Sequence, residues 1–218
     1  MKYDCIIVNG DSYTAETYEH MVYSQYISET SDHHHVLNYA MAGCGNKRIF
    51  RSTVEAVAQA KKDFSNILCI IGYSFLHRKE IWYEGNDEKL LARCYNTRLI
   101  TSSWLNDDIP TIYELNDNLV LTQFYDDLFM FYNTLENLNC KYYIFPGAQN
   151  LFCIKYKKYL ENLYTYQMCK SNVNIVPMES FCIANFARSK NLPTKFTGHM
   201  NQQGHREFAK HLIKELDL

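Results

Sequence analysis

The sequence predicts an α/β fold, a three-layer α/β/α sandwich around a five-stranded parallel sheet. Five short apolar runs alternate along the chain with longer segments of helical character, which is the order expected of right-handed βαβ units. The first run, Cys5–Val8, is continuously apolar, as is typical of a parallel strand covered on both faces. With 218 residues, the chain has the length of one domain with a full-sized core.

The predicted strands are short and end at residues that favour turns. The first, Cys5-Ile6-Ile7-Val8, leads into Asn9-Gly10, and the fourth stops at Pro146-Gly147. Glycine and proline at such places interrupt a strand. The five predicted strands are Cys5–Val8, Val36–Tyr39, Asn66–Ile71, Tyr142–Phe145 and Asn174–Pro177.

Helical patterns fill the intervals between the strands. In the last of them Phe208, Leu212 and Leu216 share one face, and Asn201 stands where an N-cap residue is expected. The predicted helices span about 13–27, 47–62, 118–137, 155–169, 181–188 and 202–216.

The stretch from about 79 to 117 interrupts this alternation. It holds both tryptophans, Trp82 and Trp104, together with Pro110 and the acidic pair Asp107-Asp108. We interpret it as an irregular, partly helical excursion of a single domain, 1–218, placed to cover a functional site.

The composition excludes several classes of protein. The formal net charge is −2, and no basic cluster is longer than a lysine pair, which argues against a nucleic-acid-binding surface. The longest apolar run, Ile67–Ile71, is too short to span a membrane. Because the first residues lead directly into a strand without the apolar region of a signal peptide, we expect a cytoplasmic protein.

Neither the cysteines nor the histidine run predicts a metal site. Cys5 and Cys69 lie inside strand-like runs, and the chain has no Cys-x-x-Cys pair, so the thiols are expected to pack as small hydrophobic groups. The side chains of His33-His34-His35 point apart and have no matching carboxylate or cysteine cluster. We expect a solvated loop there, and no metal or organic cofactor.

A serine follows the first strand directly, in Asn9-Gly10-Asp11-Ser12. At a strand-to-helix turn, a serine can present its hydroxyl above the sheet beside backbone N–H groups that suit a developing oxyanion. Taken alone, Asp or Ser ahead of a helix is more often a simple N-cap.

A histidine near the other end of the chain gives the serine a partner. His199 comes just ahead of the last predicted helix, on a loop from which it can reach the neighbouring strand end. A lone loop histidine is usually structural. The pairing with Ser12 is informative, because a serine nucleophile needs an adjacent base.

Three segments, in order, resemble the motifs of the SGNH/GDSL hydrolase family over nearly the whole chain. They are Gly10-Asp11-Ser12, the run from Asn38 to Gly43, and His199-Met200-Asn201-x-x-Gly204-His205, where Met200 replaces the family's usual proline. The resemblance implies a flavodoxin-like SGNH hydrolase fold with Ser12 as nucleophile and His199 as general base. It also implies an oxyanion hole made by the backbone N–H groups of Ser12 and Gly43, with Asp11 shaping the turn and His205 packing in the helix.

The sequence departs from the family pattern at the third motif. Gly72-Tyr73-Ser74-Phe75 places Ser74 where the family has an asparagine that donates to the oxyanion. A hydroxyl also donates one hydrogen bond but reaches less far, so Asn46 or Arg78 is a candidate to compensate, with Asn46 favoured. The run around Ser74, with Arg78 and Glu80, resembles a variant found in hydrolase-like proteins of tailed phages and marine bacteria.

The second departure concerns the acid that orients the base. The family has an aspartate two or three residues before the histidine, whereas this chain has Phe196 and Thr197. Glu80, after the third strand, is a candidate replacement. The alternative, which we favour, is a Ser12–His199 dyad in which a backbone carbonyl or water orients the imidazole.

The resemblance implies a serine esterase that cleaves a carboxylic ester through a covalent acyl-enzyme. A small-molecule or glycan ester, such as an O-acetyl group on a glycan, suits the family. Two other classes remain open: an O-acyltransferase that uses the same site, and a non-catalytic binding protein with a decayed site.

Overall fold

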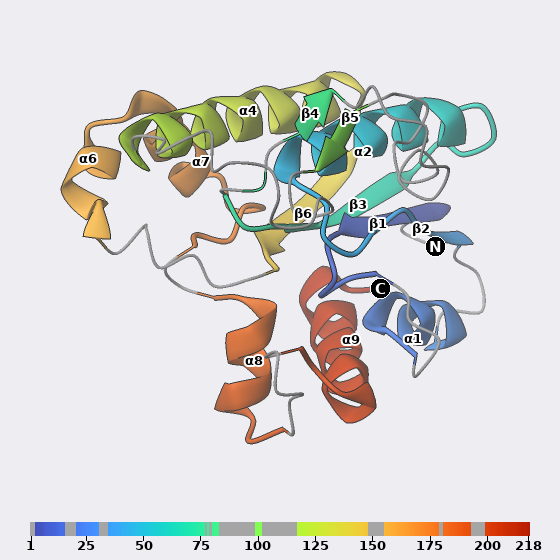
Figure 1. The fold of residues 1–218 in the computed structure, drawn as a ribbon. Helices are drawn as coiled ribbons and strands as arrows, with labels where there is room; N and C mark the ends of the chain where they lie inside the picture. Colours follow the sequence, from blue (N-terminus) through green and yellow to red (C-terminus); the bar gives the residue numbers. More distant parts are fainter. Residues whose placement is uncertain are drawn as a thin grey trace.

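The computed structural model describes residues 3–15, 21–30, 35–76, 78, 80–82, 99–101, 117–147, 155–178, 181–192 and 199–218. Its centre is a parallel sheet in the order β2-β1-β3-β6 (Figure 1). The strands are β1 (Cys5–Gly10), β2 (His35–Asn38), β3 (Ile67–Tyr73) and β6 (Lys141–Pro146). The neighbours of β1 are distant in sequence, so its carboxyl end gathers loops from separate parts of the chain.

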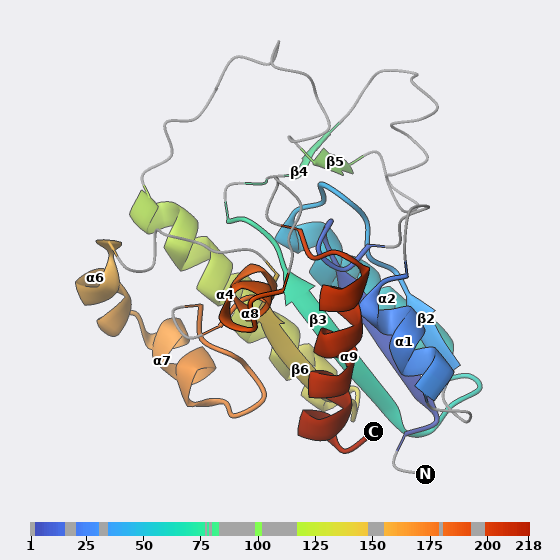
Figure 2. The same cartoon turned by 90° about the horizontal axis from the view of Figure 1, so that it is seen from below.

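Helices cover both faces of this sheet, as the sequence predicts (Figures 1 and 2). One face carries α2 (Asn46–Ala60) and α4 (Asp117–Asn137), with the short helices α6 (Lys157–Glu161) and α7 (Tyr164–Ser171) beside α4. The other carries α1 (Tyr23–Thr30), α8 (Ile183–Ser189) and α9 (Gln202–Leu216). The three-layer architecture is therefore confirmed.

Alternate residues of β1 enter two separate hydrophobic clusters. Cys5 and Ile7 pack toward α2 and α4, whereas Ile6 and Val8 pack toward α1, α8 and α9. All four are fully buried. This two-sided burial explains why the strand is a continuous apolar run, since neither of its faces meets water.

The predicted fifth strand is absent from the described sheet, which has four strands instead of five. Around Ile175 a single parallel bridge forms to Ile144, in which the N–H of Val176 donates to the carbonyl of Ile144 at 2.8 Å. The next bond of this ladder would run from the N–H of residue 146 to the Val176 carbonyl, but residue 146 is a proline and has no N–H to donate, so the pairing does not extend into a strand.

Two predicted helices are shorter or divided. The segment predicted as a helix over 13–27 begins with a turn, and α1 starts at Tyr23, with residues 16–20 outside the described part. The helix predicted over 155–169 is divided into α6 and α7, because Leu163 adopts an extended backbone with ψ 116°.

The described part of the excursion is an antiparallel strand pair, not a helix. β4 (Glu80–Trp82) pairs with β5 (Leu99–Thr101). The remaining residues of 83–116, including Trp104, Asp107-Asp108 and Pro110, lie outside the described residues.

The histidine run is only partly described. His33 and His34 lie outside the described residues, while His35 begins β2 and does not belong to a loop. Within the described ranges, no group of His, Cys, Asp or Glu side chains could hold a metal ion. No helix among these residues is long and apolar enough to cross a membrane.

Candidate active site

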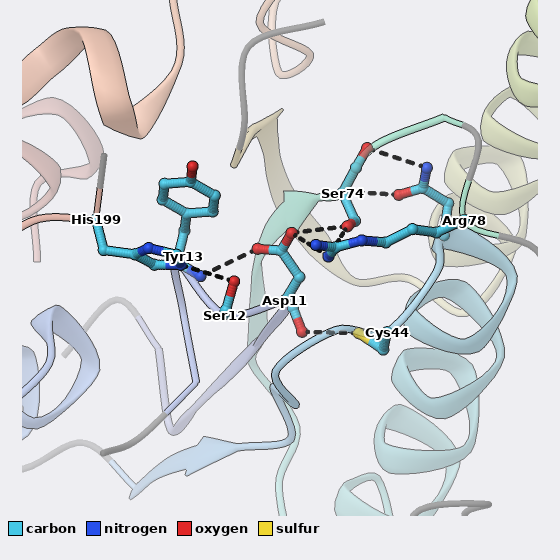
Figure 3. Close-up of polar contacts among 9 residues, drawn as sticks. Asp11, Ser12, Tyr13, Cys44, Ser74, Arg78 and His199 are labelled. Atoms are coloured by element: carbon cyan, nitrogen blue, oxygen red, sulfur yellow. Dashed lines mark hydrogen bonds and ion pairs between the residues drawn. The ribbon is translucent and has the colours of Figure 1, made fainter. Parts of the chain in front are cut away.

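Ser12 and His199 meet beyond the carboxyl end of β1 (Figure 3). Ser12 lies in the turn after the strand, and His199 directly precedes Met200 and α9. Ser12 Oγ and His199 Nε2 are 2.8 Å apart. That is hydrogen-bond distance, and it is the contact that a hydroxyl nucleophile and its base require.

The turn that holds Ser12 is fixed by Asp11 and Gly10. The Asp11 carbonyl accepts from the N–H groups of Thr14 and Ala15 at 2.9 and 2.8 Å, and its Oδ1 accepts from the Tyr13 N–H at 3.1 Å. A Cβ at position 10 would lie 2.5 Å from Thr14 Oγ1, so only glycine allows this close approach.

Asn9, near the end of β1, anchors the same turn to α2. Its Nδ2 lies 3.1 Å from the carbonyl of Ile49, 2.8 Å from Ser52 Oγ and 2.9 Å from Thr53 Oγ1. Its Oδ1 accepts from the Gly10 N–H at 2.8 Å. Sequence reasoning missed this role, although a polar residue at the end of a buried strand needs such partners.

The position of His199 depends on the start of α9. Asn201 Oδ1 accepts from the Gly204 N–H at 2.9 Å, which confirms Asn201 as the N-cap. A Cβ at Gly204 would lie 2.8 Å from the Cβ of Met200, so this glycine lets the buried Met200 pack against the first turn. His205, one turn into the helix, is buried and stacks on Tyr23.

A buried polar cluster lies on the side of Asp11 away from His199 (Figure 3). Asp11 Oδ2 accepts from Ser74 Oγ at 2.7 Å and from Arg78 Nη1 at 3.0 Å, and Arg78 Nη1 also donates to Ser74 Oγ at 2.8 Å. Burial raises the pKa of Asp11, while hydrogen bonds from Ser74 and the Tyr13 N–H and the charges of Arg78 and His199 act in the opposite direction.

Ser74 and Asn46, two of the three side chains considered as oxyanion donors, are hydrogen-bonded within the protein. The Ser74 hydroxyl donates to Asp11. Asn46 Nδ2 donates to the Ser74 carbonyl at 3.2 Å, and its Oδ1 accepts from the Ser74 N–H at 2.7 Å. Asn46 therefore holds the loop after β3 in place through both ends of its amide.

Gly43 lies in the loop that follows β2, beside the turn of Ser12. Its φ of 79° is a left-handed conformation that favours glycine. The Met41 N–H and Cys44 Sγ both donate to the Gly10 carbonyl, at 3.0 and 3.2 Å. Burial raises the pKa of the Cys44 thiol to about 12, so Cys44 is no competing nucleophile despite its position.

Glu80, which the sequence offers as an acid for His199, is paired with Arg51. Its two carboxylate oxygens accept from Arg51 of α2 at 2.7 and 2.8 Å. This bidentate pair holds β4 against α2 and gives Glu80 a structural role. Phe196 and Thr197, where the family has its acid, lie outside the described residues.

A pocket of about 110 Å³ opens beside Arg78, between α2, α4 and the loop after β3. Leu76, Val120 and Phe124 form its apolar lining. The polar residues around it are Asn46, Lys47, Arg78, Glu80, Gln123 and Asp127. Arg78, which lines this pocket, also donates to Asp11 in the turn that carries Ser12.

The comparison with solved structures identifies the fold. The chain matches no protein-family model and no curated protein sequence. It is similar to a structure assigned to the lipolytic G-D-S-L family from Desulfitobacterium hafniense DCB-2, with a TM-score of 0.54 and 10% identity over 97% of this chain and 98% of that one.

Two further structures are similar over comparable lengths. The lipase/acylhydrolase from Enterococcus faecalis has a TM-score of 0.51 and 12% identity, covering 97% of this chain and 94% of that one. The psychrotrophic esterase EstA from Pseudoalteromonas sp. has a TM-score of 0.50 and 14% identity over 98% of both chains. The fold is therefore that of the SGNH/GDSL proteins, as the motifs predict.

Proposed function

We propose that this protein is a serine esterase that cleaves carboxylic esters, with Ser12 as nucleophile and His199 as general base. The observation that carries the proposal is the 2.8 Å contact between Ser12 Oγ and His199 Nε2. Its place at the carboxyl end of a parallel sheet is where such folds bind their ligands. The SGNH/GDSL fold supports the same reading.

The reaction proceeds through a covalent ester. His199 Nε2 takes the Ser12 proton as Oγ attacks the ester carbonyl carbon, and the imidazolium then returns the proton to the leaving alcohol. Water attacks the acyl-enzyme with His199 again as base, which releases the acid and restores Ser12. The backbone N–H groups of Ser12 and Gly43 stabilise the oxyanion in both steps.

Arg78 is the side chain that we assign as a third oxyanion donor. Ser74 is shorter than the asparagine it replaces, and the Arg78 guanidinium reaches its hydroxyl at 2.8 Å. One nitrogen, Nη1, is held by Asp11 and Ser74, and Arg78 also lines the pocket beside the site. An oxyanion donor typically contributes about 2.7–4 kcal/mol of transition-state stabilisation.

The pocket beside Arg78 supports a sugar as the alcohol part of the ester. Amide and charged side chains such as Asn46, Gln123 and Asp127 line it next to the ring of Phe124. Such groups can hydrogen-bond to several hydroxyls while a ring packs against the sugar face. An O-acetyl group on a glycan is therefore the substrate class we propose.

The test uses an activated acetyl ester and a fluorophosphonate probe on wild type and Ser12→Ala. Wild type should hydrolyse the ester and gain the mass of one phosphonyl group on the peptide that carries Ser12. The variant should do neither, while its melting temperature stays close to wild type. Wild-type turnover in the variant would show that another residue is the nucleophile. Labelling of Ser12 with acyl transfer to an added sugar, in place of hydrolysis, would assign the O-acyltransferase instead.

A further inference from the structure

Two consecutive residues hold His199 from different sides. Ser12 Oγ contacts the edge of the imidazole at Nε2, and the ring of Tyr13 lies on its face. The two ring centroids are 4.3 Å apart and the planes differ by 13° (Figure 3). Ser12 and Tyr13 belong to one turn, so a single short segment supplies both contacts to His199.

The Tyr13 ring is held in place and does not simply fill space. Its side chain is 7% exposed and packs in the hydrophobic cluster that includes Met200 and Phe208. Its N–H is bonded to Asp11 Oδ1, so the backbone that carries the ring is part of the rigid turn. The imidazole therefore rests on a fixed aromatic surface.

The stack can distinguish a charged imidazole from a neutral one. The face of an aromatic ring is its negative side, and it attracts a cation placed over it. During the reaction His199 is a cation while it holds the proton of Ser12, so the attraction grows as the reaction advances. Among the described residues, the charged groups near this pair are Asp11 in the turn, Arg78 in the loop after β3 and Arg188 on α8, and the titratable thiol of Cys182 also lies near Tyr13.

We infer that Tyr13 is a positioning residue for the general base: its ring fixes the plane of the imidazole with Nε2 toward Ser12 and stabilises the imidazolium that forms. The inference rests on the proposed function and deepens it, because it gives His199 an orienting partner that the family motifs do not contain.

The experiment compares Tyr13→Leu, which keeps an apolar side chain without a π-face, with Tyr13→Phe, which keeps the ring. In Tyr13→Leu we expect kcat/KM to fall at least about fivefold, and the acidic limb of its pH profile to move about 0.5–1 unit to lower pH. The direction follows because a base whose cation is less stabilised loses its proton at lower pH. Tyr13→Phe should restore both quantities to near wild type.

Two further measurements keep the inference testable. Pentafluorophenylalanine at position 13 keeps the shape of the ring but reverses its face charge, so it should behave like leucine even where Tyr13→Leu folds poorly. An NMR titration of the His199 ring, assigned with His199→Ala, reads the stack without any need for turnover. If wild type is active and the Leu and pentafluoro forms share its pH profile and titration, the inference is overturned. If wild type is inactive but its His199 titration shifts in these forms, the stack stands and the esterase proposal fails.

Discussion

Replacing Asp11 by asparagine tests the buried cluster that supports the nucleophile turn. Asparagine has the same shape and can still accept from the Tyr13 N–H, but its amide would face Arg78 Nη1, which now donates to Asp11 Oδ2 at 3.0 Å. Asp11 is fully buried and Arg78 is 15% exposed. Removing one member of a buried pair costs about 3–5 kcal/mol, and we expect the lower end, about 3 kcal/mol, because Arg78 can turn partly toward water.

For a domain of this size, that loss corresponds to a fall in melting temperature of about 6–12 °C. Thermal and urea unfolding of wild type, Asp11→Asn, Arg78→Met and the double variant would measure it. The double variant should lose at least about 1 kcal/mol less than the sum of the single changes, since it leaves no unpaired charge. Strict additivity, or an Asp11→Asn variant as stable as wild type, would refute the reasoning.

A matched control lies on the surface of α9. Glu207 is paired with Lys210 at 2.7 Å, but both side chains are well exposed, and such pairs contribute about 0.2–1 kcal/mol. Glu207→Gln should therefore change the free energy of unfolding by less than about 1 kcal/mol.

The difference in stability between wild type and Asp11→Asn is expected to depend on pH. The pKa of Asp11 is raised in the folded state above its ordinary value of 3.8, so the folded protein binds this proton more tightly than the unfolded chain does. The stability that wild type derives from the protonated form is present below pH 3.8 and is lost as the pH rises through the folded pKa. Asparagine binds no proton at this position, so urea unfolding between pH 3.8 and neutral pH should show a fall in stability in wild type that Asp11→Asn lacks.

Two other predictions separate catalytic from structural roles. His199→Ala should lower kcat at least about a hundredfold with little effect on the melting temperature. His205→Ala removes a buried ring stacked on Tyr23, so it should lower stability more than turnover. Ester hydrolysis and thermal unfolding of both variants test this, and the opposite pattern would show that the two roles are exchanged. Glu80→Gln should leave kcat within a few-fold of wild type while lowering the free energy of unfolding by about 1–3 kcal/mol, because Arg51 loses a bidentate carboxylate. A hundredfold loss of kcat would instead show that Glu80 is the acid that orients His199.

Much of the fold could be predicted because its signals are local. The strand β1 is buried on both faces, so its side chains had to be continuously apolar, and its end at Gly10 is marked by a residue that nothing larger can replace. The last helix was equally readable, since Asn201 caps it and its apolar residues share one face. The prediction of a fifth strand was wrong, because an apolar run shows that a segment is buried but not that its backbone hydrogen bonds are paired along its whole length.

The parallel architecture and the positions of Ser12 and His199 could be inferred from the amino-acid sequence, because a turn after a strand and a loop before a helix are properties of short segments. The contacts around these two residues depend on how the whole chain folds. The roles expected of Ser74, Asn46 and Glu80 rest on their positions relative to the motifs, yet each is bonded to a residue at least 28 positions away. The stack of Tyr13 on His199 joins residues from opposite ends of the chain. Contacts between residues this far apart in sequence depend on which loops the strand order brings together. A local sequence pattern therefore cannot predict them.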